Sequence, residues 1–142
     1  MLTVHPILQF LATLPALYVL YLGMERFGSL HLRSQTTFRW KRHVTLGYLS
    51  VGTWLVGMAA GATMVYLYWH GILITGTHAR VSLVMVPFMV FGLASGLYMD
   101  RRKLKRKALP LMHGASNLVV LILALTQMVS GWWVYKVFVQ GG

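Results

Sequence analysis

Four histidines are the candidates in this chain for ligand residues, because one lies near the start of each long apolar stretch. They are His5, His43, His78 and His113. If successive stretches cross a membrane in alternating directions, the starts of the first and third lie at one face, and those of the second and fourth at the other. The sequence therefore predicts two imidazole pairs, one at each face. A pair of imidazoles flanking a flat macrocycle is the ligand set of a bis-histidine haem.

Each histidine also has a plainer interpretation. An imidazole inside a membrane span is costly unless it faces a partner, but at the interface it can bond to water or headgroups. His113 favours the ligand role most, because it lies inside its apolar stretch and the small residue Gly114 follows it. His5 could instead lie in water at a frayed end. His70, at the end of the second stretch, then competes with it as the partner of His78.

Two arginines lie next to the candidate ligands. Arg42 precedes His43 and Arg80 follows His78 by two residues. The fork of a guanidinium suits a carboxylate, so either arginine could pair with a haem propionate. For Arg42 the simpler explanation is its place in a basic loop, whereas Arg80 is the only basic residue between the second and third stretches.

The composition indicates a membrane protein. Of 142 residues, 57% are hydrophobic and only 11% are charged, and the mean hydropathy is +0.64. A soluble domain needs more charge to cover its surface. Because roughly 20 residues cross a bilayer as a helix, each apolar stretch is long enough. We predict one all-α domain over residues 1–142, an antiparallel four-helix transmembrane bundle with spans at about 7–24, 44–69, 81–99 and 111–139.

The basic residues predict the orientation. Eleven of the 13 lie between the first and second spans or between the third and fourth. By the positive-inside rule both loops are cytoplasmic and both termini are not. We expect a multi-pass protein of a bacterial inner membrane. The net charge of +11 does not indicate nucleic-acid binding, because the charge lies in loops between spans.

Several kinds of chemistry are excluded by composition. The chain has no cysteine, which rules out thiolate-ligated clusters and covalently attached haem. Glu25 and Asp100 are the only carboxylates, and both lie at the predicted cytoplasmic turns, so paired-carboxylate catalysis has no candidates. No charged residue lies deep in a span, which argues against a proton pump or an ion-coupled transporter. We detect no internal sequence repeat.

Short motifs around the histidines resemble the cytochrome b561 superfamily, and more closely a small four-helix branch of largely uncharacterised membrane proteins. The motifs are His5-Pro6, Arg42-His43 with Leu46-Gly47, Gly76-Thr77-His78, and His113 with Asn117-Leu118-Val119, Gln127 and Ser130-Gly131. Better-known members hold two haems b between histidines of four core helices and pass electrons across the membrane. The resemblance implies the same here, with His5 paired to His78 and His43 to His113 as iron ligands. Those members have six helices, and their ascorbate-site motifs have no match in this chain.

We therefore expect a di-haem b membrane cytochrome that carries electrons from a quinol or another reductant to an acceptor on the opposite face. The donor and acceptor are left open, and with them whether the chain is an oxidoreductase in its own right. A redox partner protein or a homodimer is compatible with so small a chain. The alternative is a cofactor-free membrane subunit that anchors or assembles a larger complex, with histidines that only cap helix ends.

Overall fold

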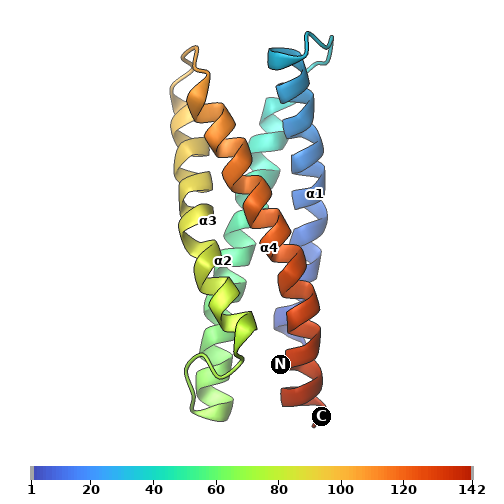
Figure 1. Ribbon diagram of the computed structural model, residues 1–142, viewed down its shortest axis with the longest axis vertical. Helices are drawn as coiled ribbons and strands as arrows, with labels where there is room; N and C mark the ends of the chain where they lie inside the picture. Colours follow the sequence, from blue (N-terminus) through green and yellow to red (C-terminus); the bar gives the residue numbers. More distant parts are fainter. Residues whose placement is uncertain (1, 142) are drawn as a thin grey trace.

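Four long helices make up almost the whole chain in the computed structural model, which describes residues 2–141. They are α1 (Val4–His31), α2 (Trp40–Trp69), α3 (Thr77–Arg101) and α4 (Ala108–Val139). Short loops join them (Figure 1). The all-α prediction is confirmed.

Each helix is long and apolar enough to cross a membrane, in agreement with the predicted membrane class. The helices are longer than the predicted spans. The first continues through Glu25 to His31, for example, because the backbone bonding of a helix continues where the side chains become polar. At the other end of α1, Pro6 is tolerated in the first turn, where its missing N–H would have no helical partner.

The helices pack as two pairs that close into a bundle. α1 packs most extensively on α2, and α3 on α4, while contacts between α1 and α4 and between α2 and α3 complete the ring. α1 and α3 therefore face each other diagonally, as do α2 and α4. Both termini lie at one end with the loop between α2 and α3, and the other two loops lie at the opposite end (Figure 1).

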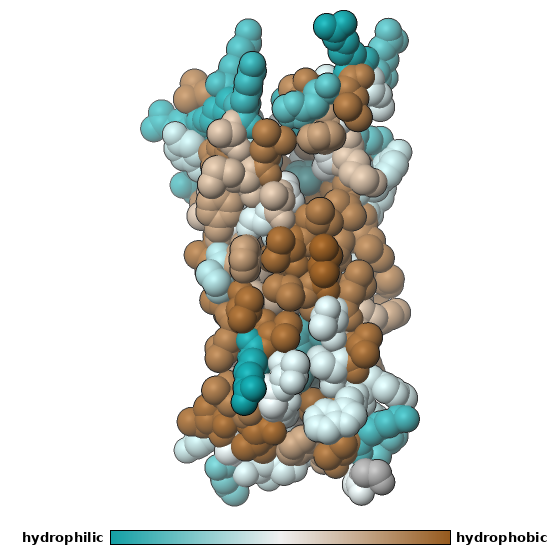
Figure 2. Space-filling model, in the orientation of Figure 1, coloured by the Kyte–Doolittle hydropathy of each residue, from teal (hydrophilic) through white to brown (hydrophobic). Residues whose placement is uncertain are grey.

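The buried core lies midway along the bundle and draws on all four helices. Trp54, Met89 and Leu121 are among its largest members, and small residues such as Ala12 and Ala124 let the backbones approach one another. Most large apolar side chains point outward instead. Figure 2 shows them as a broad apolar band below a polar end. An apolar exterior around a small core is what a lipid environment requires.

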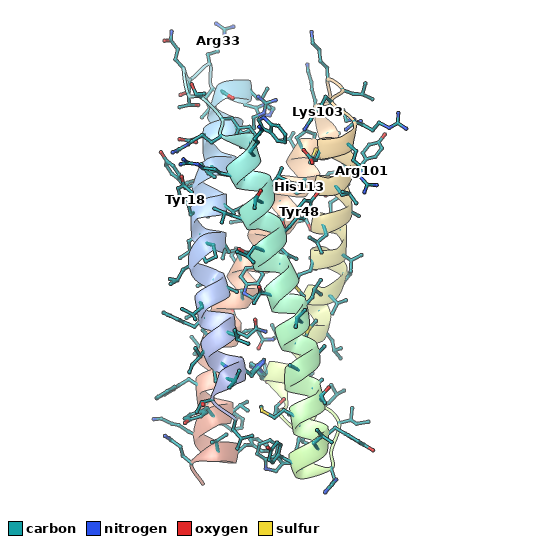
Figure 3. The ribbon with its side chains drawn as sticks, turned by 180° about the vertical axis from the view of Figure 1, so that it is seen from behind. Tyr18, Arg33, Tyr48, Arg101, Lys103 and His113 are labelled. Atoms are coloured by element: carbon teal, nitrogen blue, oxygen red, sulfur yellow. The ribbon has the colours of Figure 1, made fainter. Side chains whose placement is uncertain are left out.

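The polar end is the one with the two basic loops, where Arg33, Arg101 and Lys103 lie (Figure 3). Glu25 bonds to Arg39 at 3.0 Å, which ties the end of α1 to the residue before α2. The hydrogen bond from Arg39 to the Glu25 carboxylate raises the pKa of the Arg39 guanidinium above its ordinary value. The ammonium of Lys103 lies 4.0 Å from the ring centre of Trp40, a cation–π contact between the loop before α4 and the first residue of α2.

Candidate functional site

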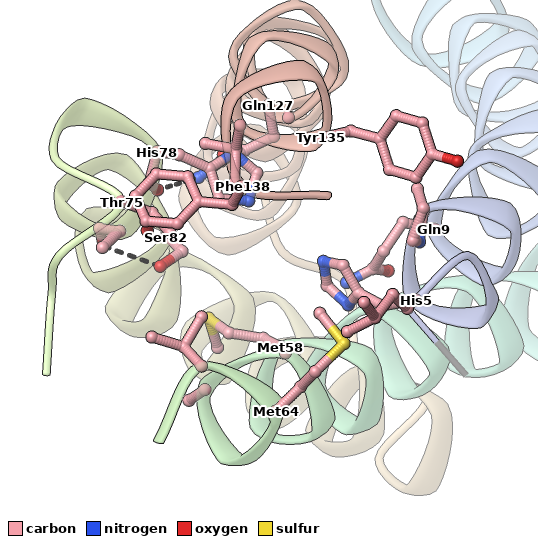
Figure 4. A pocket seen from close by; sticks show the side chains of 18 of the residues that line it. His5, Gln9, Met58, Met64, Thr75, His78, Ser82, Gln127, Tyr135 and Phe138 are labelled. Atoms are coloured by element: carbon pink, nitrogen blue, oxygen red, sulfur yellow. Dashed lines mark hydrogen bonds between the residues drawn. The ribbon is translucent and has the colours of Figure 1, made fainter. Parts of the chain in front are cut away.

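The first histidine pair lies at the end of the bundle that holds the termini. His5 in the first turn of α1 faces His78 in the first turn of α3, with ring centres 6.5 Å apart and planes at 86°. Both line a cavity of about 1110 Å³ that opens between the helices. In Figure 4 the two imidazoles enter this cavity from opposite sides, with Met58 and Met64 of α2 below them. The cavity is large enough for a sizeable organic cofactor.

The second pair lies toward the basic end. His43 in the first turn of α2 faces His113 in the second turn of α4, with ring centres 6.3 Å apart and planes at 60°. Figure 3 shows His113 below the basic loops. The two pairs are therefore alike in separation and each bridges one diagonal of the bundle.

Every one of these imidazoles is held by its Nδ1 atom. His5 Nδ1 lies 2.8 Å from the carbonyl oxygen of Gly57, and His43 Nδ1 lies 3.2 Å from that of Val19. A carbonyl oxygen only accepts hydrogen bonds, so in both rings Nδ1 carries the proton. The Nε2 lone pair of each ring is then available to a metal, which is how metal-ligating histidines are commonly oriented.

Serine hydroxyls do the same for the other two rings. Ser95 Oγ donates to the carbonyl oxygen of Phe91 at 2.6 Å, so it accepts from His113 Nδ1 at 2.8 Å. Ser130 Oγ likewise lies 3.0 Å from His78 Nδ1 and accepts its hydrogen bond. Each facing pair thus joins one imidazole bound to a carbonyl with one bound to a serine.

Side-chain amides support the same helices. Asn117 donates to the carbonyl oxygen of His113 at 2.8 Å, and Gln127 donates to that of His78 at 2.8 Å. The Asn117 amide nitrogen also lies 3.4 Å from both ring nitrogens of His113. Because His113 Nδ1 already carries a proton, Nε2 is the only one of these two nitrogens with a lone pair. Gln9, one turn after His5, donates to the carbonyl oxygen of Trp54 at 3.3 Å.

The ring separations suit an iron between the imidazoles. A metal–imidazole nitrogen bond of about 2.0–2.1 Å, plus about 1.1 Å from that nitrogen to the ring centre, puts two axial ring centres roughly 6.3 Å apart. The observed values are 6.5 Å and 6.3 Å. Within residues 2–141 no three side chains of His, Asp or Glu gather around one point. The histidines come as pairs, which is the number of axial ligands that a bis-histidine haem takes.

The remaining predicted residues lie further out. Arg42 and Arg80 are both exposed, and within residues 2–141 neither side chain makes a hydrogen bond or an ion pair. Their pairing with propionates stays a prediction. His70 is exposed at the end of α2, in a left-handed conformation with φ of 49°, and is not among the cavity-lining residues. His5, in contrast, lies directly across from His78.

Sequence reasoning missed Ser95 and gave Ser130 no role at the imidazole. The available signal was a Ser-Gly dipeptide in each of the last two helices, Ser95-Gly96 and Ser130-Gly131. Serine is common in membrane helices as a packing residue, so the dipeptide by itself does not predict a histidine contact.

Comparisons with family models, with curated proteins and with solved structures found no match to this chain.

Proposed function

We propose that this chain is an integral membrane cytochrome, an antiparallel four-helix bundle that binds two haems b and passes electrons between the faces of the membrane. His5 and His78 would hold one haem, and His43 and His113 the other. Electrons would come from a quinol or another reductant at one face and leave to an acceptor at the other.

The facing pairs carry this proposal. Two independent diagonals of the bundle have ring centres at 6.5 Å and 6.3 Å, close to the roughly 6.3 Å expected for axial imidazoles. In all four rings the Nδ1 atom lies within 3.2 Å of an acceptor oxygen, which leaves Nε2 for iron. A set of helix-capping histidines has no reason to meet ring to ring in this way.

A haem would supply a reversible one-electron change at iron, and the chain's own residues would orient it and adjust its potential. The hydrogen bonds from Nδ1 fix the tautomer and the plane of each imidazole. Apolar neighbours such as Trp54, Met58 and Met89 line the cavity at the first pair and give it a low polarity. Both effects act on the redox potential of a bound haem.

The charge distribution supports an orientation. The two basic loops lie at the end nearer to His43 and His113, so the positive-inside rule puts that pair at the cytoplasmic face. The pair of His5 and His78, with both termini, would then lie at the opposite face.

The deciding experiment is the haem content of detergent-purified protein after haem-replete expression, measured by pyridine haemochrome absorbance. We expect about two haems b per chain with low-spin spectra. His113→Ala should leave one haem, and His31→Ala, a change at an exposed histidine at the end of α1, should leave two. A colourless wild-type protein would contradict the proposal and favour the anchor or assembly subunit.

A further inference from the structure

Each of the four helices carries a glycine 18 residues after its histidine. Eighteen residues are five turns of 3.6, so the two residues lie on the same face of the helix. At 1.5 Å per residue they are about 27 Å apart, close to the roughly 30 Å of a hydrocarbon core. The histidine–glycine couples are His5 and Gly23, His43 and Gly61, His78 and Gly96, and His113 and Gly131.

Within each packed helix pair, α1 with α2 and α3 with α4, the glycine of either helix contacts the histidine of the other. In all four cases the atom nearest to a β-carbon built on the glycine is Cε1 of that imidazole. The distances are 2.8 Å for Gly61 and His5, 3.1 Å for Gly131 and His78, 3.3 Å for Gly96 and His113, and 3.6 Å for Gly23 and His43.

These contacts do not follow from glycine in a helix as such. A β-carbon built on Gly52 of α2 or on Gly114 of α4 meets nothing within 4 Å. Glycine lowers helix stability relative to alanine, and neither of these two positions gains a close contact from its missing side chain. At Gly61 the missing side chain admits a ring.

We propose that Gly61, Gly96 and Gly131 are positioning residues that seat the imidazoles of His5, His113 and His78. This rests on the proposed function, in which those imidazoles hold the haems. Gly23 has the same place in α1 but only an ordinary van der Waals contact with His43. Cε1 lies between Nδ1 and Nε2 in the ring. Because Nδ1 is bonded on one side, a methyl group pushing on Cε1 turns the ring and changes the direction in which Nε2 points.

The two helix pairs are built to one plan. Histidine and glycine of α3 follow those of α1 by 73 residues (78 − 5 and 96 − 23), and those of α4 follow α2 by 70 (113 − 43 and 131 − 61). The surrounding sequence is not repeated, and the shared feature is the placement of two residues per helix. The groups that hold Nδ1 differ between the helix pairs: they are carbonyl oxygens for the histidines of α1 and α2 and serine hydroxyls for those of α3 and α4.

The test compares Gly61→Ala with Gly52→Ala, two substitutions that raise helix propensity equally in α2. We expect Gly61→Ala to lower the haem content from about two to about one per chain, through loss at His5 and His78. Gly52→Ala should keep both haems at the wild-type midpoint potentials. Gly61→Ala with both haems at unchanged potentials would overturn the inference.

A second readout uses the haem-free protein, with histidine labelled by ¹³C and ¹⁵N. The ring resonances of His5 should shift in Gly61→Ala and stay in place in Gly52→Ala. If wild-type protein binds no haem, the proposed function fails, and this measurement still decides whether Gly61 seats the ring. Unshifted resonances would show that it does not.

A second pair of variants guards against misfolding of Gly61→Ala. Gly131→Ala has the milder contact at 3.1 Å with His78, and Gly114→Ala is its open-space control on α4. Gly131→Ala should shift the potential of one haem and the ring resonances of His78. Gly23→Ala, at an ordinary contact distance of 3.6 Å, should behave as wild type. Equal effects at Gly131 and Gly114 would contradict the inference.

Discussion

At the scale of single residues, the structure separates the four histidines by what holds their Nδ1 atoms. Carbonyl oxygens of Gly57 and Val19 cannot be removed by a side-chain substitution, whereas the hydroxyls of Ser95 and Ser130 can. The serines therefore offer a direct test of whether the orientation of an imidazole affects ligand binding.

Ser95→Ala removes the acceptor for His113 Nδ1–H at a buried position. Partners of this kind typically contribute about 10- to 100-fold to metal affinity. We expect the haem between His43 and His113 to dissociate faster by roughly that factor. Competition with apomyoglobin measures the rate.

Ser29→Ala is the control for this change, since within residues 2–141 the Ser29 hydroxyl bonds only to the carbonyl oxygen of Arg26, near the end of α1. It should leave both dissociation rates at the wild-type values. Equal rates in the two variants would show that Ser95 does not orient His113.

Between the helices α2 and α4, one pair of equivalent buried positions holds a polar residue in one helix and an apolar residue in the other. Ser50 and Val120 are 70 residues apart, the offset that relates these helices, and each is only 1% exposed. Val120 fits the apolar core, but Ser50 Oγ is buried without a hydrogen-bond partner within residues 2–141. A buried hydroxyl that bonds to nothing costs stability.

Ser50→Ala should therefore leave the free energy of unfolding unchanged or raise it by about 1 kcal/mol. Reversible SDS unfolding followed by circular dichroism measures this. The spectra of both haems should be unaffected. A loss of stability of more than about 1 kcal/mol would mean that the hydroxyl has a partner in the native protein.

For the molecule as a whole, the charge distribution and the arrangement of the loops together predict the orientation in a membrane. The basic residues cluster in loops that are adjacent at one end of the bundle, as Figures 1 and 3 show. The opposite end carries only Arg80 and Lys136 among the basic residues. This asymmetry predicts that the first end stays in the cytoplasm.

Single-cysteine labelling tests this prediction without background, because the chain has no cysteine. Thr36→Cys and Leu104→Cys report on the two basic loops, and Ile72→Cys reports on the opposite one. All three positions are exposed. In intact cells a membrane-impermeant maleimide should label position 72 alone, and permeabilisation should expose the other two. Labelling of position 36 or 104 before permeabilisation would reverse the orientation.

Features that depend on local composition could be predicted from the sequence. Four apolar stretches, the helices they form and the separation of basic loops from apolar spans all follow from which residues are adjacent in the chain. The position of one histidine near the start of each stretch is also evident from the sequence. The ends of the helices could be predicted less well, because α1 continues past Glu25: the apolar side chains end there, but the backbone hydrogen bonding continues.

Which side chains contact one another depends on the tertiary structure. The choice of His5 over His70 opposite His78, the bond from His113 to Ser95, and the seat of His5 on Gly61 all depend on how each helix is rotated and how far it is shifted along its neighbour. Rotation and shift are set by packing among residues far apart in the chain. The 18-residue spacing between histidine and glycine can be counted in the sequence. Only the structure shows that each glycine contacts the histidine of the other helix in its packed pair.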